Sequence, residues 1–541
     1  MAKPKLALIP AAQGSKFYSV LPSDGVGDFD FTRNSSATRI APTGFIETSE
    51  LFGSDLLSGY DFTSGWVLYS GATSTLNSFT GYNNSGIYKS ILVSGKTYKM
   101  VIAGNTTSTN GASVSDFPET QNYKSVSSGA FSETFYFQAN GTNLFLTNNS
   151  LGTTTFTTLS LQEQIGKSRL NYDLLNGKVV NCPHYLLEPA RTNLFPQSQY
   201  FISGSGWSAA NLNRTSNSLV SPDGTLNATK IEATGTGGHP LYDDLAAISN
   251  GTYTFSMFLK KGENTSLASM SDGYSTSNIS FDLDAVTVSA NTGSTLNPFI
   301  KEYNDGWFRV GYSLTATVGQ TQPALYLFDA NGQQSFTGNG ETMYVWGAQF
   351  EQGSYPTSYI PTNGTAITRA AETATGSGNA ATFNSTEGVL MAEIAALAND
   401  GTNRFISLTN GVTDATNISL AFTTTTNQIR ILVDISYVLQ MSITYTVNSV
   451  LDFNKIILKY KENDFAFWVN GFEVATDSSG TVPTANYISD LSFQRMNSLQ
   501  FYGKTRELQY FDSALTDAQL ETLTSWTSLQ EMITSQLYTN Y

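Results

Sequence analysis

The side chains that most often perform catalysis are scarce in this sequence. It contains two histidines, His184 and His239, and one cysteine, Cys182. Because the histidines lie far apart in the chain, a Ser-His-Asp triad or a histidine-rich metal site has few residues to draw on. Cys182 and His184 would share one face of a strand, but no other sign of a cysteine enzyme accompanies them. We interpret Cys182 as a structural thiol.

Paired carboxylates are the remaining route to hydrolysis, since glycoside hydrolases use two of them. The candidates are Asp243 with Asp244 and Asp282 with Asp284. Adjacent acids in the turns of an acidic protein are usually solvated. We therefore predict no catalytic residue and no enzyme, and a polysaccharide depolymerase of the glycoside hydrolase type is the alternative.

Calcium is a further candidate ligand, because carboxylate and carbonyl oxygens bind it. Asp400, Asp414 and Asp452 fall within one predicted module. No loop there has the dense Asp-x-Asn-x-Asp pattern of a dedicated calcium loop. We predict no metal site and no cofactor, and calcium stays an open alternative.

Two tryptophans hold matching positions in two similar stretches of the chain. Trp66 and Trp207 each follow a Ser-Gly pair. An exposed aromatic ring offers a flat apolar face to the C–H groups of a sugar, which makes both rings candidate glycan platforms. Core packing explains a repeated tryptophan equally, so both interpretations stay open. Trp307, Trp346 and Trp468 lie in clear strand patterns and are predicted core residues.

The composition indicates which elements position these side chains. Only 13% of the residues are charged, aromatic residues reach 12%, and Gly, Ser, Thr and Asn are abundant. Aromatic and β-branched residues between small polar ones are typical of pleated sheets joined by tight turns. The sequence predicts an all-β protein of three tandem antiparallel β-sandwich modules, jelly-roll or concanavalin-like in type, with a short C-terminal helix.

The net charge excludes several classes of partner. At −15, with a pI near 4.6, the chain lacks the basic surface that nucleic acid or an anionic membrane requires. No run of about 18 apolar residues predicts a membrane span. The start of the chain does not resemble a secretion signal, so synthesis in a cytoplasm is expected.

The two similar stretches are interpreted as a diverged repeat, with one module at 54–166 and the other at 197–361. Their landmarks occur in the same order: 64–66 and 205–207, 94–98 and 249–253, 136–141 and 327–332, and 156–163 and 343–351. Period-two alternation between the landmarks and Asn-Gly or Asp-Gly pairs predict hairpins of a β-sandwich.

The last third of the chain is predicted as a linker, a third sandwich and a helix. Small residues at 362–378 indicate a flexible linker, and 379–527 contains strand patterns around an Asn-Gly turn. Thr516 and Gln519 form a capping-box pattern that begins a helix at 516–537. This helix packs either on its own domain or on a neighbouring subunit.

Several motifs resemble signatures of a family of tailed-bacteriophage virion proteins. They lie at 3–10, 19–22, 27–33, 37–40, 186–194 and 346–362, and the stretch 501–520 is similar to the closing strand of laminin-G/concanavalin-like sandwiches. The resemblance implies carbohydrate-binding-module-like sandwiches on a tail fibre, tail tip or head decoration. It implies other virion proteins, host surface glycans and further copies of the chain as partners, with a location on the virion exterior. Fibres are commonly trimers, although no heptad pattern here states a number.

The resemblance also suggests a split N-terminal element. In the family, the first signature runs soon into the second, whereas here the first sandwich is inserted between them. Residues 1–53 and 167–196 are therefore expected to form one base or anchoring element.

Four charged residues of this element are candidates for anchoring and assembly. They are Arg33, Arg39, Glu188 and Arg191. Arginine forks pair bidentately with carboxylates, so these residues are expected either in an internal ion pair or in a contact between subunits.

Overall fold

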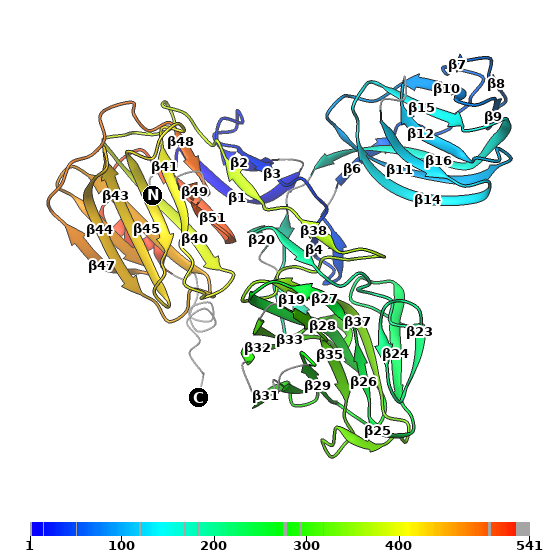
Figure 1. Cartoon of the computed structure of the whole chain (residues 1–541). Coiled ribbons are helices and arrows are strands. Elements are labelled where there is room, and N and C mark those ends of the chain that lie inside the picture. Colours follow the sequence, from blue (N-terminus) through cyan, green and yellow to red (C-terminus); the bar gives the residue numbers. More distant parts are fainter. Residues whose placement is uncertain are drawn as a thin grey trace. The chain divides into compact units, whose positions relative to one another are not determined.

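The computed structural model describes residues 3–13, 16–49, 51–117, 121–166, 169–180, 183–273, 278–292, 295–316, 319–495 and 499–525. The chain is all-β apart from one short helix and a single 3-10 turn in the part that is described (Figure 1). It divides into two compact units, one comprising Met1–Ser49 with Ser168–Tyr541 and the other Glu50–Lys167. The bounds of the second unit differ by only a few residues from those of the predicted inserted module, 54–166.

The inserted unit is a sandwich of two antiparallel sheets. Its core contains Ile87 and Leu144 from one sheet and Met100 and Leu159 from the other. The first sheet has the order β13 (Asn122–Val126), β12 (Ala112–Asp116), β15 (Asn143–Asn148), β10 (Ser85–Ser90) and β7 (Val67–Tyr69). The second has the order β14 (Gly129–Gln138), β11 (Thr97–Thr106), β16 (Gly152–Gly166), β9 (Ser78–Gly81) and β8 (Thr73–Ser74), with β6 (Leu51–Asp55) also on β16.

The second sandwich, drawn in green in Figure 1, has two sheets of six strands. One has the order β22 (Ser208–Ala209), β26 (Pro240–Tyr242), β35 (Ala324–Leu327), β29 (Leu267–Ser271), β30 (Asn278–Asp282) and β31 (Thr287–Thr292). The other has the order β23 (Leu212–Val220), β24 (Leu226–Ala233), β37 (Thr342–Gln352), β28 (Gly251–Lys261), β33 (Trp307–Ala316) and β32 (Thr295–Glu302). Small two-stranded ladders add β25 (Thr236–Gly238) with β36 (Ser335–Thr337) and β27 (Leu245–Ile248) with β34 (Gly319–Thr321).

The two sandwiches share one strand order, which supports the predicted repeat. The order β7-β10-β15-β12-β13 matches β22-β26-β35-β29-β30, and β9-β16-β11-β14 matches β24-β37-β28-β33. One predicted correspondence is wrong. Asn140 follows β14, whereas Asn331 follows β35, the counterpart of β15. Asn-Gly pairs occur in any tight turn, so they do not identify equivalent positions.

The third sandwich takes strands from both ends of the chain. Its longer sheet has the order β39 (Thr373–Thr375), β3 (Phe29–Thr32), β2 (Lys16–Leu21), β1 (Leu6–Gln13), β51 (Gly503–Phe511), β40 (Glu387–Ala396), β45 (Asn454–Lys461), β46 (Phe465–Val469) and β47 (Phe472–Asp477). Figure 1 shows the blue N-terminal strands beside the orange strand β51. The facing sheet has the order β44 (Val438–Thr446), β43 (Gln428–Ile435), β42 (Asn417–Phe422), β41 (Arg404–Thr409) and β48 (Asp490–Ser492).

The two halves of the predicted split element do meet. Asn171 accepts a hydrogen bond from the Ile40 N–H at 2.8 Å, and Arg169 donates to the Thr38 carbonyl at 3.0 Å. They do not form an element of their own, however. Strand β1 and strand β20 (His184–Leu187) both pair with β51 of the third sandwich, whose core includes Leu6 and Tyr185. Strands β1, β2, β3 and β20 of the predicted base are thus part of the third module, whereas Ile40, Ile46 and Leu174 pack in a cluster with Trp307 and Trp346 of the second sandwich.

The predicted linker at 362–378 is wrong. Strand β38 (Ile367–Arg369) pairs with β21 (Arg191–Asn193), and β39 pairs with β3. Glu372 and Ala374 are fully buried. Residues 363–368 are exposed, but the segment supplies two paired strands and several buried side chains, so a composition typical of linkers does not exclude strand pairing.

Helix α1 (Asp517–Thr524) begins as predicted, and the Gln519 side chain accepts a hydrogen bond from the Thr516 backbone N–H at 3.0 Å. Leu520 packs with Met391 and Trp468 on the outer face of the longer sheet, so the helix packs on its own domain. The rest of the predicted stripe, Leu529, Met532, Ile533 and Leu537, lies outside the described residues.

Candidate functional site

The arginines of the anchoring prediction lead to a buried ionic cluster. Arg33 donates to Glu372 at 2.9 Å, and Arg169 contacts both Glu372 and Glu188, the latter at 2.7 Å. Arg369 contacts Glu188 at 2.8 Å. Burial alone would raise the pKa of the Glu188 carboxyl, but Arg169 and Arg369 outweigh burial and hold this pKa well below its usual range. Arg33 and Glu188 therefore each take part in ion pairs within the chain, which is the first of the two interpretations.

The other two anchoring candidates lie apart from this cluster. Arg39 makes a two-pronged contact with Glu47, at 2.7 and 2.9 Å, on the hairpin of β4 (Thr38–Ile40) and β5 (Ile46–Thr48). Arg191 lies near Glu351, at 4.0 Å, and over the Tyr355 ring, rather than beside its sequence neighbour Glu188. Both contacts are within the chain.

The two candidate glycan platforms are buried. Trp207 is 2% exposed, packs against Phe195 and Phe201, and donates from Nε1 to the Gln197 carbonyl at 2.7 Å. Trp66 is 9% exposed and packs edge-on against Phe62. Neither ring presents a face to solvent, so the platform interpretation is wrong and core packing is correct. Trp307, Trp346 and Trp468 are also buried, as predicted.

An aromatic cluster occupies the outer face of the first sandwich instead. Phe145 in β15 points away from the core, because its neighbours Leu144 and Leu146 point into it. Phe117 stacks on Tyr88 at 4.3 Å, and Tyr69 meets the Phe117 and Phe145 rings edge-on at 4.9 and 5.6 Å. We call Tyr69, Tyr88, Phe117 and Phe145 the first aromatic face. Its two tyrosines are partly exposed.

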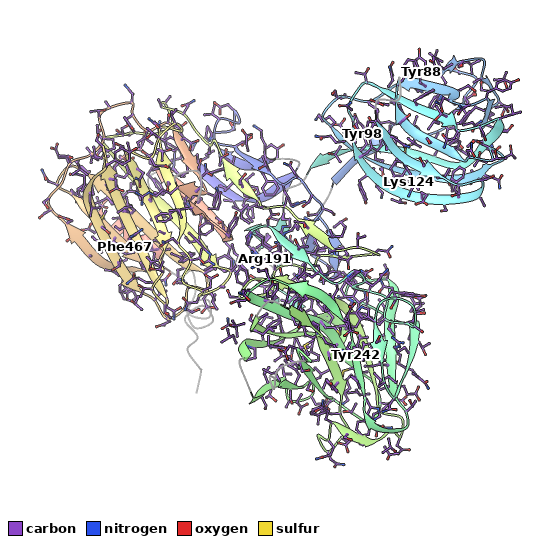
Figure 2. All side chains as sticks on the ribbon, in the orientation of Figure 1. Tyr88, Tyr98, Lys124, Arg191, Tyr242 and Phe467 are labelled. Atoms are coloured by element: carbon purple, nitrogen blue, oxygen red, sulfur yellow. The ribbon has the colours of Figure 1, made fainter. Side chains whose placement is uncertain are left out.

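The second sandwich has aromatic residues on the matching face. Tyr326 in β35 points outward between the core residues Leu325 and Leu327. Tyr242 in β26 pairs with Ala324 and is therefore the diagonal neighbour of Tyr326 on the same face. We call Tyr242 and Tyr326 the second aromatic face. Figure 2 labels Tyr88 and Tyr242 on their sandwiches.

Corresponding serines accompany the two aromatic faces. Ser115 pairs with Phe145 across β12 and β15, and Ser269 pairs with Tyr326 across β29 and β35. In the described part of the chain, the buried Oγ atoms of both serines have no hydrogen-bond partner. The two faces thus correspond in their aromatic residues and in one buried serine each, and the partly exposed rings are the part that a sugar could contact.

Neither histidine lies in a catalytic arrangement. His239 is buried, and its Nδ1 lies 2.8 Å from the Asn211 carbonyl. Asn171 donates to His184 Nε2 at 3.1 Å, which places the His184 proton on Nδ1, 3.5 Å from Asp173. Cys182 lies outside the described residues.

The neutral state of His184 predicts acid sensitivity. Burial lowers the pKa of His184 to about 3, although Asp173 opposes this. Below pH 6.5 the His184 imidazole is therefore protonated in the unfolded chain but stays neutral in the folded chain. The contribution of neutral His184 to the free energy of unfolding is fully present above pH 6.5. On acidification towards pH 3 it falls by at most about 1.4 kcal/mol per pH unit. We expect His184→Gln to flatten this loss in urea titrations at pH 7.5 and 5.0. An equal loss in both proteins would contradict the assignment.

A cavity of about 590 Å³ lies next to this histidine. Its cationic side chains include Lys504, Arg39 and Arg309. Lys504 contacts Asp173 at 2.6 Å, and Arg309 donates to the Thr357 carbonyl at 2.7 Å. These three cations already have partners within the protein, so we interpret the cavity as a structural feature rather than a ligand site.

The predicted carboxylate sites have different surroundings. Asp282 accepts backbone N–H bonds from Asp284 and Ala285, and Asp284 pairs with Lys261, as expected for acids in a turn. Asp243, in contrast, is only 6% exposed. Its buried position departs from the solvated state that the sequence predicted.

The calcium candidates do not converge on one site. Asp400 accepts a hydrogen bond from Arg404 at 2.8 Å, and burial raises the pKa of Asp452. Within the described ranges, no group of three or more His, Cys, Asp and Glu side chains is placed to hold a metal ion. Over those same ranges, no helix has the length and apolarity needed to cross a membrane.

Comparisons with known proteins found likenesses only among solved structures. A Ruminococcus gnavus sialidase CBM40 bound to α2,3-sialyllactose shares 13% identity over 26% of this chain and 83% of its own, with a TM-score of 0.23. A tandem CBM22 from Paenibacillus barcinonensis Xyn10C shares 9% over 57% and 98%, with a TM-score of 0.23. Mouse laminin α1 LG4-5 shares 10% over 62% and 94%, with a TM-score of 0.20. No family model and no curated protein matches the sequence. Likenesses of this strength carry no argument about function.

Proposed function

We propose that the protein is a bacteriophage virion structural protein whose β-sandwich modules bind carbohydrate, for particle decoration or host-surface attachment. The family signatures at 3–40, 186–194 and 346–362 support the virion role. The proposed partners are other virion proteins, further copies of the chain and host surface glycans. A tail fibre and a capsid fibre are the two locations considered.

The observation that carries the binding part is the pair of aromatic faces. They occupy the corresponding sheet in two copies of one fold, and each has tyrosine rings that are partly exposed. Packing of the core does not require aromatic residues on the outer face of the sheet. Partly exposed rings retained there in both copies are well suited to contact the apolar side of a sugar ring.

Alanine substitution of the face tyrosines tests this proposal. We expect Tyr88→Ala in the first sandwich and Tyr242→Ala in the second each to weaken binding to host polysaccharide about tenfold, equivalent to ~1.4 kcal/mol. Binding of the full chain to immobilised polysaccharide measures the effect. Tyr82→Ala is the matched control, since Tyr82 is exposed on the first sandwich outside this face. Equal losses in the control, or no loss in the face variants, would refute the proposal.

Location on the particle has a separate test. Cryo-electron microscopy of intact virions is expected to show density for three sandwiches on the exterior. If purified particles lacked this protein, the proposed virion role would be refuted, but the proposal of carbohydrate binding would be unaffected.

We also propose that the protein binds without catalysing a reaction. Release of reducing ends from host polysaccharide should not exceed the background without protein. Release that disappears in Asp244→Asn would instead favour the depolymerase.

A further inference from the structure

The second sandwich holds a cavity of about 870 Å³ that shares no lining residue with its aromatic face. Leu194, Pro196, Leu245 and Ile248 give it an apolar lining. The polar groups that line it include Arg191, Asp243, Asp244 and Gln352. An apolar cavity of this size with a few polar groups is the usual composition of a small-molecule site.

Asp243 is the most unusual group in this cavity. The residue is 6% exposed and lines the cavity, and no described residue donates a hydrogen bond to its carboxylate. Burial, and then the charge of Asp244, raises the pKa of Asp243 to about 6. Because this carboxylate lines the cavity and accepts no hydrogen bond from the described residues, a ligand hydroxyl in the cavity can donate to it.

Arg191 supplies donors to the same cavity. Its guanidinium lies against Gly353, where a Cβ atom would approach Nε to 2.7 Å, so glycine is needed for this placement. Its Nη1 donates to the Ala190 carbonyl at 3.1 Å, and its Nε is buried 4.0 Å from Glu351, so the Nη groups supply the N–H donors for a ligand. Figure 2 labels Arg191 at the upper end of the green sandwich. Asp244 accepts a hydrogen bond from Gln322 at 2.6 Å.

We propose that this cavity is a second carbohydrate site that binds an uncharged sugar residue through Asp243 and Arg191. Sugar hydroxyls donate to Asp243 and accept from Arg191, while the ring's C–H groups contact the apolar lining. Two carboxylates and one guanidinium leave the cavity negative at neutral pH, which disfavours acidic sugars. The inference depends neither on the virion role nor on the aromatic faces.

Titration of the full chain with methyl glycosides of glucose, galactose and mannose at pH 7.5 tests the site, with methyl glucuronide as the charged comparison. We expect at least one uncharged glycoside to bind and glucuronide to bind more weakly. Asp243→Asn should weaken binding about tenfold, while Asp282→Asn, an acid of the same sandwich outside the cavity, should not. If Asp243→Asn does not fold, Gln352→Ala replaces it, because the Gln352 side chain is exposed at the cavity rim.

Three results would overturn the inference. One is the absence of binding by every uncharged glycoside. Another is wild-type affinity in Asp243→Asn or in its replacement Gln352→Ala. The third is loss of binding in Tyr326→Ala alone, which would place the sugar on the second aromatic face. That last result would support the proposed function while removing the cavity site, so the two are distinguishable.

Discussion

Glu372→Ala is expected to destabilise the unit Met1–Ser49 with Ser168–Tyr541 by about 3–5 kcal/mol. Glu372 is fully buried and accepts from Arg33, Arg169 and the Glu188 backbone N–H. Removing its carboxylate leaves Arg33 without this buried counter-charge. It also leaves Arg169 to share Glu188 with Arg369. Uncompensated charge in a low dielectric is the reason for the large effect.

Denaturant unfolding monitored by tryptophan fluorescence measures this loss. Glu47→Ala is the matched control, because Glu47 also pairs with an arginine but lies at the surface. Surface pairs contribute about 0–1 kcal/mol, so the control should change stability little. If the two variants lost the same small amount, the cluster would not hold the segments together.

Trp207→Ala is expected to destabilise the second sandwich by about 3–5 kcal/mol, through loss of apolar contacts and the cavity left behind. The ring centroid of Trp207 lies 4.8 Å from that of Phe195 and 4.9 Å from that of Phe201. The Gln197 carbonyl also loses its indole donor. Thermal unfolding of the full chain measures the change.

Tyr437→Ala provides the surface comparison for this substitution. Tyr437 is 77% exposed, so its replacement should shift stability by no more than about 0.5 kcal/mol. Polysaccharide binding is the second readout for Trp207→Ala, measured below its unfolding transition. Normal stability with lost binding would restore the platform interpretation; the buried ring predicts the reverse.

Local pattern was sufficient to predict the fold class. Small polar residues alternating with aromatic residues, Asn-Gly turns and repeated Ser-Gly-Trp landmarks are properties of short segments, and they indicated sandwiches and a repeat. The inserted module was expected from the family resemblance of the segments on either side of it. The same holds for the start of α1, since a capping box involves residues only three positions apart. The faces that the tyrosines occupy needed strand register, because a shift of one residue moves a side chain to the opposite side of a sheet. One signal was present: in Leu144-Phe145-Leu146 every position is apolar, which indicates that both faces of β15 are covered.

The partners of the buried charges depended on the tertiary structure alone. Arg33 meets Glu372 across 339 positions of sequence, and no local pattern relates them. The segment around Glu372 has a linker's composition, yet it is buried because β39 pairs with β3. Residue type alone predicted that these arginines would pair with carboxylates, and Arg33 and Arg39 do so within the chain. Which carboxylate it meets follows from how distant strands close the third sandwich, and short-range preferences carry no information about that closure.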